Sequence, residues 1–147
     1  MSLKSVVIGC GSYLPKKVVT NSDLEKTLDT SNEWIIERTG IKQRHIVGDN
    51  ESTSDMAAAA AQEAIKNSGI KAEEIDLIIV ATTTPDNIFP STAARVQSII
   101  NAKNAAAFDI QAVCSGFVFA LSTVDKYIKS GEYKNVLVIG AESITRI

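Results

Sequence analysis

The sequence predicts an α/β fold with a mainly parallel sheet, and two observations support that class. Residues 75–81 and 135–140 are short, mostly apolar runs, the pattern of strands buried on both faces. Segments with helical spacing and capping residues lie between such runs. Because strands alternate with helices, we expect parallel strands joined by helical crossovers, with residues 1–147 in one domain.

Composition and charge exclude several kinds of partner. The hydrophobic fraction of 45% is ordinary for a globular domain, and 15 Lys and Arg against 17 Asp and Glu give a net charge of −2. A nucleic-acid binder would be more basic. Val6-Val7-Ile8 is too short for a signal peptide, and no stretch approaches the roughly 20 apolar residues of a membrane span. We expect a cytoplasmic protein that binds neither nucleic acid nor membranes.

The two cysteines, Cys10 and Cys114, stand far apart, with neither CxxC nor metal-ligand spacing. We therefore expect free thiols, no disulfide and no metal site. A strand is predicted over residues 5–8, and the turn Gly9-Cys10-Gly11-Ser12 follows it. This turn resembles a dinucleotide-binding loop only superficially, because the third glycine is absent and Pro15 prevents a helix from following at once. We expect Cys10 to be structural.

Two helices are predicted in the next segment. The first is a short helix through Leu28, which a side-chain oxygen of Thr20 or Asn21 can cap. The second begins at Thr30, which has capping-box spacing with Glu33, and it ends near Gly40.

Trp34 and Arg38 share one face of this second helix, because they are four residues apart. An indole and a guanidinium so placed can serve one ligand, by stacking on a base and by pairing with phosphate. The alternative is structural, with Trp34 covering the edge of the core and Arg38 paired with a nearby carboxylate.

An alanine-rich helix should begin at Ser52 or Ser54 and precede the strand over residues 75–81. Residues 82–90 then form an irregular loop at the carboxyl end of that strand, where open α/β sheets place their sites. Phe89 in this loop either lines a pocket or anchors the loop.

Cys114 follows an apolar strand and directly precedes a helix predicted to run from Gly116 to about Ser130. Unpaired N–H groups and the helix dipole at such a position stabilise a thiolate, and the same N–H groups can hold a developing oxyanion. This arrangement indicates a nucleophile for acyl transfer. The alternative is a buried cysteine that packs as a small hydrophobic residue.

The helix after Cys114 is apolar on all sides over residues 116–121, so one sheet cannot cover it. Leaving half of that surface in water would forgo roughly 1.5–3 kcal/mol for each large side chain. We infer a second layer on its far side, supplied by further chain or by a partner.

Several strings, in this order and spacing, closely resemble β-ketoacyl-acyl carrier protein synthase III. They are Gly11-Ser12-Tyr13-Leu14-Pro15, Thr30-Ser31-Asn32-Glu33-Trp34-Ile35, Arg38-Thr39-Gly40-Ile41, Ala81-Thr82-Thr83-Thr84-Pro85, Phe89-Pro90, Asp109-Ile110, Cys114-Ser115-Gly116-Phe117 and Gly140-Ala141-Glu142. The resemblance spans the chain. It implies a thiolase-like fold, layered α-β-α-β-α with a mainly parallel mixed sheet, of which this chain is the N-terminal half and the second half is absent.

The resemblance also implies a reaction, the first condensation of type II fatty-acid synthesis. An acyl group, usually acetyl, passes from acyl-coenzyme A to Cys114, and malonyl-acyl carrier protein then decarboxylates and attacks it. Trp34 stacks on the adenine, while Thr30 and Arg38 bind the nucleotide part of coenzyme A. Phe89 matches a residue that reaches the acyl pocket of the partner in a homodimer. Coenzyme A thioester is a substrate, and no cofactor is implied.

Family members continue for about as much again beyond the position of Ile147, and the catalytic His and Asn of the family lie there. The only histidine, His45, does not match the catalytic one. We therefore expect this chain alone to be inactive in condensation. Two alternatives stay open: a non-catalytic half-domain that needs a complementary chain, or another thiolase-fold initiator, of the polyketide starter or hydroxymethylglutaryl-coenzyme A synthase type.

Overall fold

The computed structural model describes residues 3–147, and their contacts form two compact units. The larger unit contains the described residues up to Tyr13 together with Ser52–Ile144. The smaller unit contains Leu14–Glu51 and Thr145–Ile147. The assignment of residues 1–147 to one domain stays a prediction.

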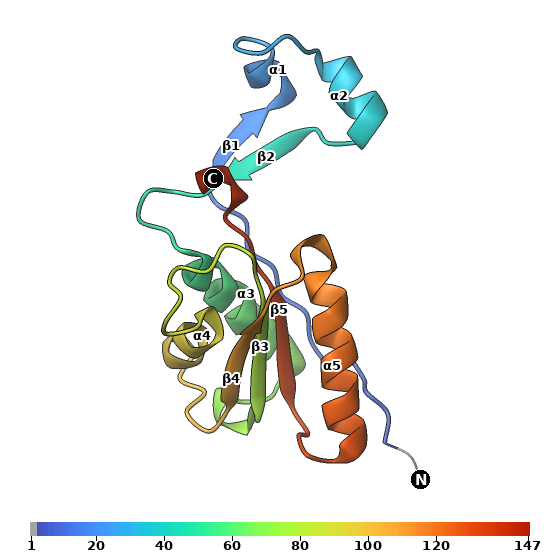
Figure 1. Cartoon of the computed structure of the whole chain (residues 1–147), viewed down its shortest axis with the longest axis vertical. Helices are drawn as coiled ribbons and strands as arrows, with labels where there is room; N and C mark the ends of the chain where they lie inside the picture. The colour runs from blue at the N-terminus through green and yellow to red at the C-terminus, as the bar shows by residue number, and fades with distance from the viewer. Residues whose placement is uncertain (1–2) are drawn as a thin grey trace. The chain divides into compact units, whose positions relative to one another are not determined.

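The larger unit has the predicted α/β class, with one sheet between two layers of helices. The three parallel strands stand in the order β4 (Ala106–Ile110), β3 (Leu77–Ala81) and β5 (Val136–Gly140). The long helices are α3 (Thr53–Ser68), α4 (Thr92–Ile99) and α5 (Gly116–Ser130). Figure 1 shows α3 and α4 beside one face of this sheet and α5 beside the other.

The central strand β3 is buried along its whole length, because its side chains alternate between two cores. Ile78 and Val80 pack with the alanines of α3 and with α4. Leu77 and Ile79 pack with Ala120 and Val124 of α5. This confirms the predicted helical cover on both faces and the predicted strand over residues 75–81, except that the strand begins two residues later, at Leu77.

Helix α3 begins where one of the two predicted caps stands, at Ser52. The Ser52 hydroxyl accepts a hydrogen bond from the Asp55 backbone N–H at 3.1 Å, and the Asp55 carboxylate accepts one from the Ser52 N–H at 2.8 Å. The bonds from Ser52 lower the pKa of the Asp55 carboxyl. The helix ends at Gly69, whose φ of 74° is the left-handed conformation that favours glycine.

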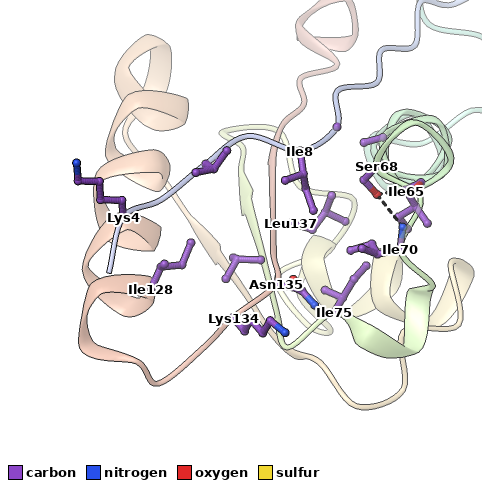
Figure 2. Close-up of a pocket in the computed structure, with 14 residues that line it drawn as sticks. Lys4, Ile8, Ile65, Ser68, Ile70, Ile75, Ile128, Lys134, Asn135 and Leu137 are labelled. Atoms are coloured by element: carbon purple, nitrogen blue, oxygen red, sulfur yellow. Dashed lines mark hydrogen bonds between the residues drawn. The ribbon is translucent and has the colours of Figure 1, made fainter. Parts of the chain in front are cut away.

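The predicted strand over residues 5–8 is wrong. These residues form no strand, and Val6 and Val7 are 75% and 74% exposed. Figure 2 shows the segment crossing beside the start of β5, and a groove of about 270 Å³ lined by both lies between them. The segment belongs to no sheet and so has no ladder partner, and its strand propensity is not expressed.

Side chains and close packing hold this segment instead. Ser5 donates a hydrogen bond to Asp125 at 3.0 Å, and Asn67 donates one to the Cys10 carbonyl at 2.8 Å. A Cβ atom at Gly11 would overlap the carbonyl oxygen of Ala60 in α3. The glycines of this turn therefore serve close packing against α3, which agrees with the rejection of a dinucleotide-binding loop.

The smaller unit contains two antiparallel strands that the sequence did not predict. The elements are β1 (Lys17–Thr20), α1 (Asn21–Leu24), α2 (Asn32–Thr39) and β2 (Gln43–Ile46). Asn21 is 1% exposed and joins them, since its amide donates to the Ile41 carbonyl at 2.8 Å and accepts from Arg44.

Short 3₁₀ turns occur at Ala72–Glu74, Val113–Ser115 and Ile144–Arg146.

The predicted capping box at Thr30 is also wrong, by one residue. Ser31 is the N-cap of α2, and its hydroxyl accepts a hydrogen bond from the Trp34 N–H at 3.1 Å. Either hydroxyl suits a cap, so the pattern alone did not separate the two neighbours. The predicted end is confirmed, because Gly40 is left-handed with φ 70°.

Within residues 3–147, every helix is too short or too polar to span a bilayer.

The packing of the amino-terminal segment on α3 can be tested with Gly11→Ala. Because the added Cβ would meet backbone atoms, we expect a loss of stability of about 1–3 kcal/mol, measured by chemical denaturation. The control is Gly48→Ala, where the nearest atoms to an added Cβ are 3.8 Å away. Equal stability of the two variants would show that this contact is unimportant.

Candidate active site

Cys114 lies where the sequence placed it, between β4 and α5. It is exposed, in the turn Val113–Ser115 that runs directly into Gly116, the first residue of α5. Val113 has φ 48°, a left-handed conformation that is rare and costly for a β-branched residue. Such strain persists only where the surroundings impose it, and here it shapes the turn that presents the thiol.

Two glycines let the start of α5 approach the strand ends. A Cβ at Gly116 would lie 3.1 Å from the Cβ of Ala81, the last residue of β3. A Cβ at Gly140, the last residue of β5, would lie 3.3 Å from the ring of Phe117. Cys114 is therefore held at the carboxyl edge of the sheet, where parallel α/β sheets place their sites.

The loops that leave β3 and β5 are joined at this edge by Glu142. Its carboxylate accepts a hydrogen bond from the Thr83 N–H at 2.8 Å and another from the Thr84 hydroxyl. The Thr84 hydroxyl in turn accepts from the Ser143 N–H at 2.8 Å. Thr53, at the start of α3, donates to the Thr84 carbonyl at 2.7 Å.

At the same edge, Asp109 near the end of β4 holds the start of α4. The two carboxylate oxygens of Asp109 accept hydrogen bonds from the N–H groups of Thr92 and Ala93, each at 2.7 Å. These N–H groups begin α4, so the carboxylate also meets the positive end of that helix. The strand that leads to Cys114 is thereby tied to the adjacent helix.

Phe89 lies at an exposed position of the loop after β3. It is 89% exposed and its neighbour Ile88 is fully exposed, whereas the body of the loop is anchored. Asp86 accepts a hydrogen bond from the Ser54 N–H at 3.1 Å and pairs with Arg95 at 3.2 Å. At this exposure Phe89 does not pack as an anchor against the residues that the structure describes.

A second set of predicted residues lies in the smaller unit, on α2. The guanidinium carbon of Arg38 is 4.8 Å from the ring centroid of Trp34, so the predicted shared face is confirmed. Trp34 is 52% exposed. Among residues 3–147, Arg38 forms no ion pair, and the hydroxyl of Thr30 is buried with no hydrogen-bond partner. The structural alternative, a covered Trp34 and a paired Arg38, does not describe this helix.

His45 has a structural environment in β2. One ring nitrogen is hydrogen-bonded to the Pro15 carbonyl, and the other lies 3.2 Å from the Gln43 side chain.

Glu33, beside Trp34, accepts a hydrogen bond from the Asn32 side chain at 3.1 Å, which lowers the pKa of its carboxyl. Across the described residues no three His, Cys, Asp or Glu side chains form a group that could hold a metal ion.

Sequence reasoning missed the supporting roles of Asp109, Glu142 and Val113. Asp109 and Glu142 belong to the strings that carry the resemblance, yet their hydrogen bonds join segments that are distant in sequence. An acidic residue at or just after the end of an apolar strand was the available signal. The left-handed φ of Val113 has no signal in its residue type.

Comparisons with known proteins agree with this geometry. A family model described as 3-Oxoacyl-[acyl-carrier-protein (ACP)] synthase III matches residues 108–147, which include Cys114. The β-ketoacyl-[acyl-carrier-protein] synthase III of Ehrlichia canis is 66% identical over 144 residues, and that of Rhodospirillum centenum is 56% identical over 147 residues. The alignments cover 98% and 100% of this chain, but 45% and 46% of the two relatives.

Solved structures show the same backbone. The 3-oxoacyl-[acyl-carrier-protein] synthase III of Aquifex aeolicus has a TM-score of 0.92 at 55% identity, covering 98% of this chain and 46% of that one. A priming β-ketosynthase from the R1128 polyketide pathway has a TM-score of 0.94 at 36% identity, covering 99% and 44%. The fold is therefore that of the N-terminal half of these condensing enzymes.

The chain thus spans about half the length of the curated relatives it matches. In the matched cysteine segment, the fold and the identities above, the chain is similar to the N-terminal half of β-ketoacyl-acyl carrier protein synthase III.

Proposed function

We propose that this chain supplies the acyl-accepting cysteine of a β-ketoacyl-acyl carrier protein synthase III. The observation that carries the proposal is the exposed thiol of Cys114 at the start of α5. An exposed position lets a thioester reach the sulfur, while the helix start supplies N–H groups and a positive dipole end. The alternative interpretation of the sequence, a buried cysteine that packs as a small hydrophobic residue, does not fit the exposed Cys114.

The proposed first step is a thioester exchange. The thiolate of Cys114 attacks the carbonyl carbon of the acyl-coenzyme A, forming a tetrahedral oxyanion. When this collapses, the bond to the coenzyme A sulfur breaks, coenzyme A leaves as the thiolate, and the acyl group stays on Cys114. Backbone N–H groups at the turn are the natural donors to the oxyanion. We propose an acetyl group as the usual primer.

The nucleotide part of coenzyme A is assigned to α2. Trp34 presents half of its surface to solvent for stacking on adenine, and Arg38, which forms no ion pair within residues 3–147, can pair with phosphate. The unpaired hydroxyl of Thr30 supports a polar contact with the same ligand.

The second step, decarboxylation of malonyl-acyl carrier protein and attack on the acyl-cysteine, needs a His and an Asn that this chain does not supply in those roles. We therefore assign condensation to the whole enzyme, acting as a homodimer in which Phe89 reaches the partner. The exposure of Phe89 supports that role. Two free thiols support a cytoplasmic location. The proposal needs no cofactor.

A polyketide starter function is the weaker reading within the same fold. Identity to the fatty-acid relatives reaches 66%, against 36% for the priming β-ketosynthase.

The acyl carrier can be identified by exposing the protein to acetyl-coenzyme A and measuring its intact mass. We expect the mass of one acetyl group on the wild type and on Cys10→Ala, and none on Cys114→Ala, because only one thiol stands at a helix start. Acetylation that persists in Cys114→Ala would contradict the assignment.

The role of α2 predicts a binding defect in Trp34→Ala. Because stacking on one base contributes about 1–3 kcal/mol, the acyl-coenzyme A concentration that half-saturates acetylation should rise about tenfold. The maximal rate should hardly change. Leu28→Ala, which alters another exposed apolar side chain of this unit, is the control. An unchanged half-saturating concentration in Trp34→Ala would remove the indole from the site.

One observation favours the second candidate, a half-domain that depends on a complementary chain. Four large side chains in the first turns of α5 stay 42–66% exposed: Phe117, Val118, Phe119 and Leu121. Surface of this kind in a soluble monomer is rare and marks an interface. It fits the inference from sequence that this helix needs a second layer.

The half-domain reading makes its own prediction for the 147-residue chain by itself. Its exposed apolar surface should drive self-association, so size-exclusion chromatography should show oligomers or aggregates. Charged substitutions at Val118 and Phe119 should shift the chain toward monomer, while Leu28→Glu should not. A compact, soluble wild-type monomer with native circular dichroism would contradict the dependence.

A further inference from the structure

The carboxylate of Glu142 joins two loops that are far apart in sequence. Thr83 and Thr84, which follow β3, donate to its two oxygens, the Thr83 N–H over 2.8 Å. The Thr84 hydroxyl also accepts a hydrogen bond from the Ser143 N–H at 2.8 Å, and Ser143 is the residue that follows Glu142. We call these residues, Thr83, Thr84, Glu142 and Ser143, the loop clasp.

The loop clasp lies directly beyond the strand ends that hold the start of α5. Gly116 packs on Ala81, two residues before Thr83. Phe117 packs on Gly140, two residues before Glu142. The backbone also pairs across these ends, since the Ala141 N–H donates to the Ala81 carbonyl at 3.2 Å. The clasp therefore fixes the segments that flank the helix start after Cys114.

Within the clasp, one polar atom is left without a partner. The hydroxyl of Thr83 is buried and has no hydrogen-bond partner among residues 3–147. Buried hydroxyls are nearly always paired, so an orphan one needs a reason. The Glu142 carboxylate holds the backbone N–H of that same residue, and it thereby sets where the orphan hydroxyl lies.

We propose that Glu142 is a positioning residue for acyl transfer to Cys114, acting through Thr83. This rests on the proposed acyl-accepting role of Cys114. Glu142 does not touch the reacting atoms; it holds the Thr83 segment at the rim of the site, so that the incoming thioester meets a preformed surface. Only a carboxylate fits the loop clasp, because each of its two oxygens accepts a hydrogen bond, one from the Thr83 N–H and one from the Thr84 hydroxyl.

Glu142→Gln tests the proposal with little change in size. The amide oxygen still accepts from the Thr83 N–H, but the amide nitrogen meets the Thr84 hydroxyl, which has lost its acceptor. We expect the first-order rate of Cys114 acetylation at saturating acetyl-coenzyme A to fall at least about tenfold, since a displacement of about 1 Å can cost about a hundredfold. The half-saturating concentration should stay within about twofold, because α2 is untouched.

A purely structural role is separated by a second reagent. Iodoacetamide needs an exposed thiol and no positioned rim, so its rate of Cys114 alkylation, measured in a Cys10→Ala background, should be the same in Glu142→Gln and wild type. The matched control is Glu74→Gln, whose carboxylate accepts the Lys71 N–H at 2.8 Å in the turn before β3. That variant should keep both rates.

Thr84→Val gives an independent route if Glu142→Gln folds poorly. It removes the hydroxyl that joins Glu142 to Ser143, and it should slow acetylation in the same direction. The double variant should be no slower than the slower single one, because both act on one clasp. Equal acetylation rates in all variants would overturn the proposal, and so would a parallel loss of acetylation and alkylation. If wild-type Cys114 takes no acetyl group, the proposed function fails first.

Discussion

The contact between the start of α5 and the ends of β3 and β5 is the constraint on which the candidate site depends. Gly116 has no side chain, so the first turn of the helix can approach Ala81 to a distance that a Cβ would crowd at 3.1 Å. The turn before it must then fold tightly, and Val113 takes a left-handed conformation to do so. The thiol of Cys114 follows from these two conditions: it is placed at a helix start and left exposed.

The remaining polar groups of the larger unit serve the same edge of the sheet. Asp109 ties β4 to the start of α4, and Glu142 ties the loop after β3 to the loop after β5. Thr53 connects this edge to the start of α3. Side-chain hydrogen bonds thus link the ends of β3, β4 and β5 to neighbouring segments. Sites built on such supported elements hold their geometry better than sites on free loops.

The sequence predicted the elements whose signals are local. The buried strand over residues 75–81, the caps at Ser52 and Gly40, and the helix after Cys114 all depend on residue spacing that the structure preserves. The strand predicted over residues 5–8 is wrong because a strand needs a ladder partner, and these residues belong to neither sheet. The antiparallel strands of the smaller unit were missed for the related reason that their pairing is not encoded in a strong alternation.

The candidate site divides in the same way. Cys114, Trp34 and Arg38 were found from the sequence because a cysteine before a helix and an i, i+4 pair are local patterns. The supporting roles of Glu142 and Asp109 were not predicted, because their hydrogen-bond partners are 58–59 and 16–17 residues away in the sequence. The role of Val113 was not predicted, because it depends on a left-handed backbone conformation that a β-branched side chain disfavours. Long-range hydrogen bonds and strained turns leave no local pattern in the sequence, so only the three-dimensional structure shows them.

We propose that the sulfur of Cys114 carries the acyl group. Peptide mapping by tandem mass spectrometry, after brief exposure to acetyl-coenzyme A, locates the modified side chain. We expect an acetyl group on the peptide that contains Cys114, and neutral hydroxylamine should remove it, as it removes a thioester. An acetyl group on any other side chain, or a hydroxylamine-stable one, would contradict it.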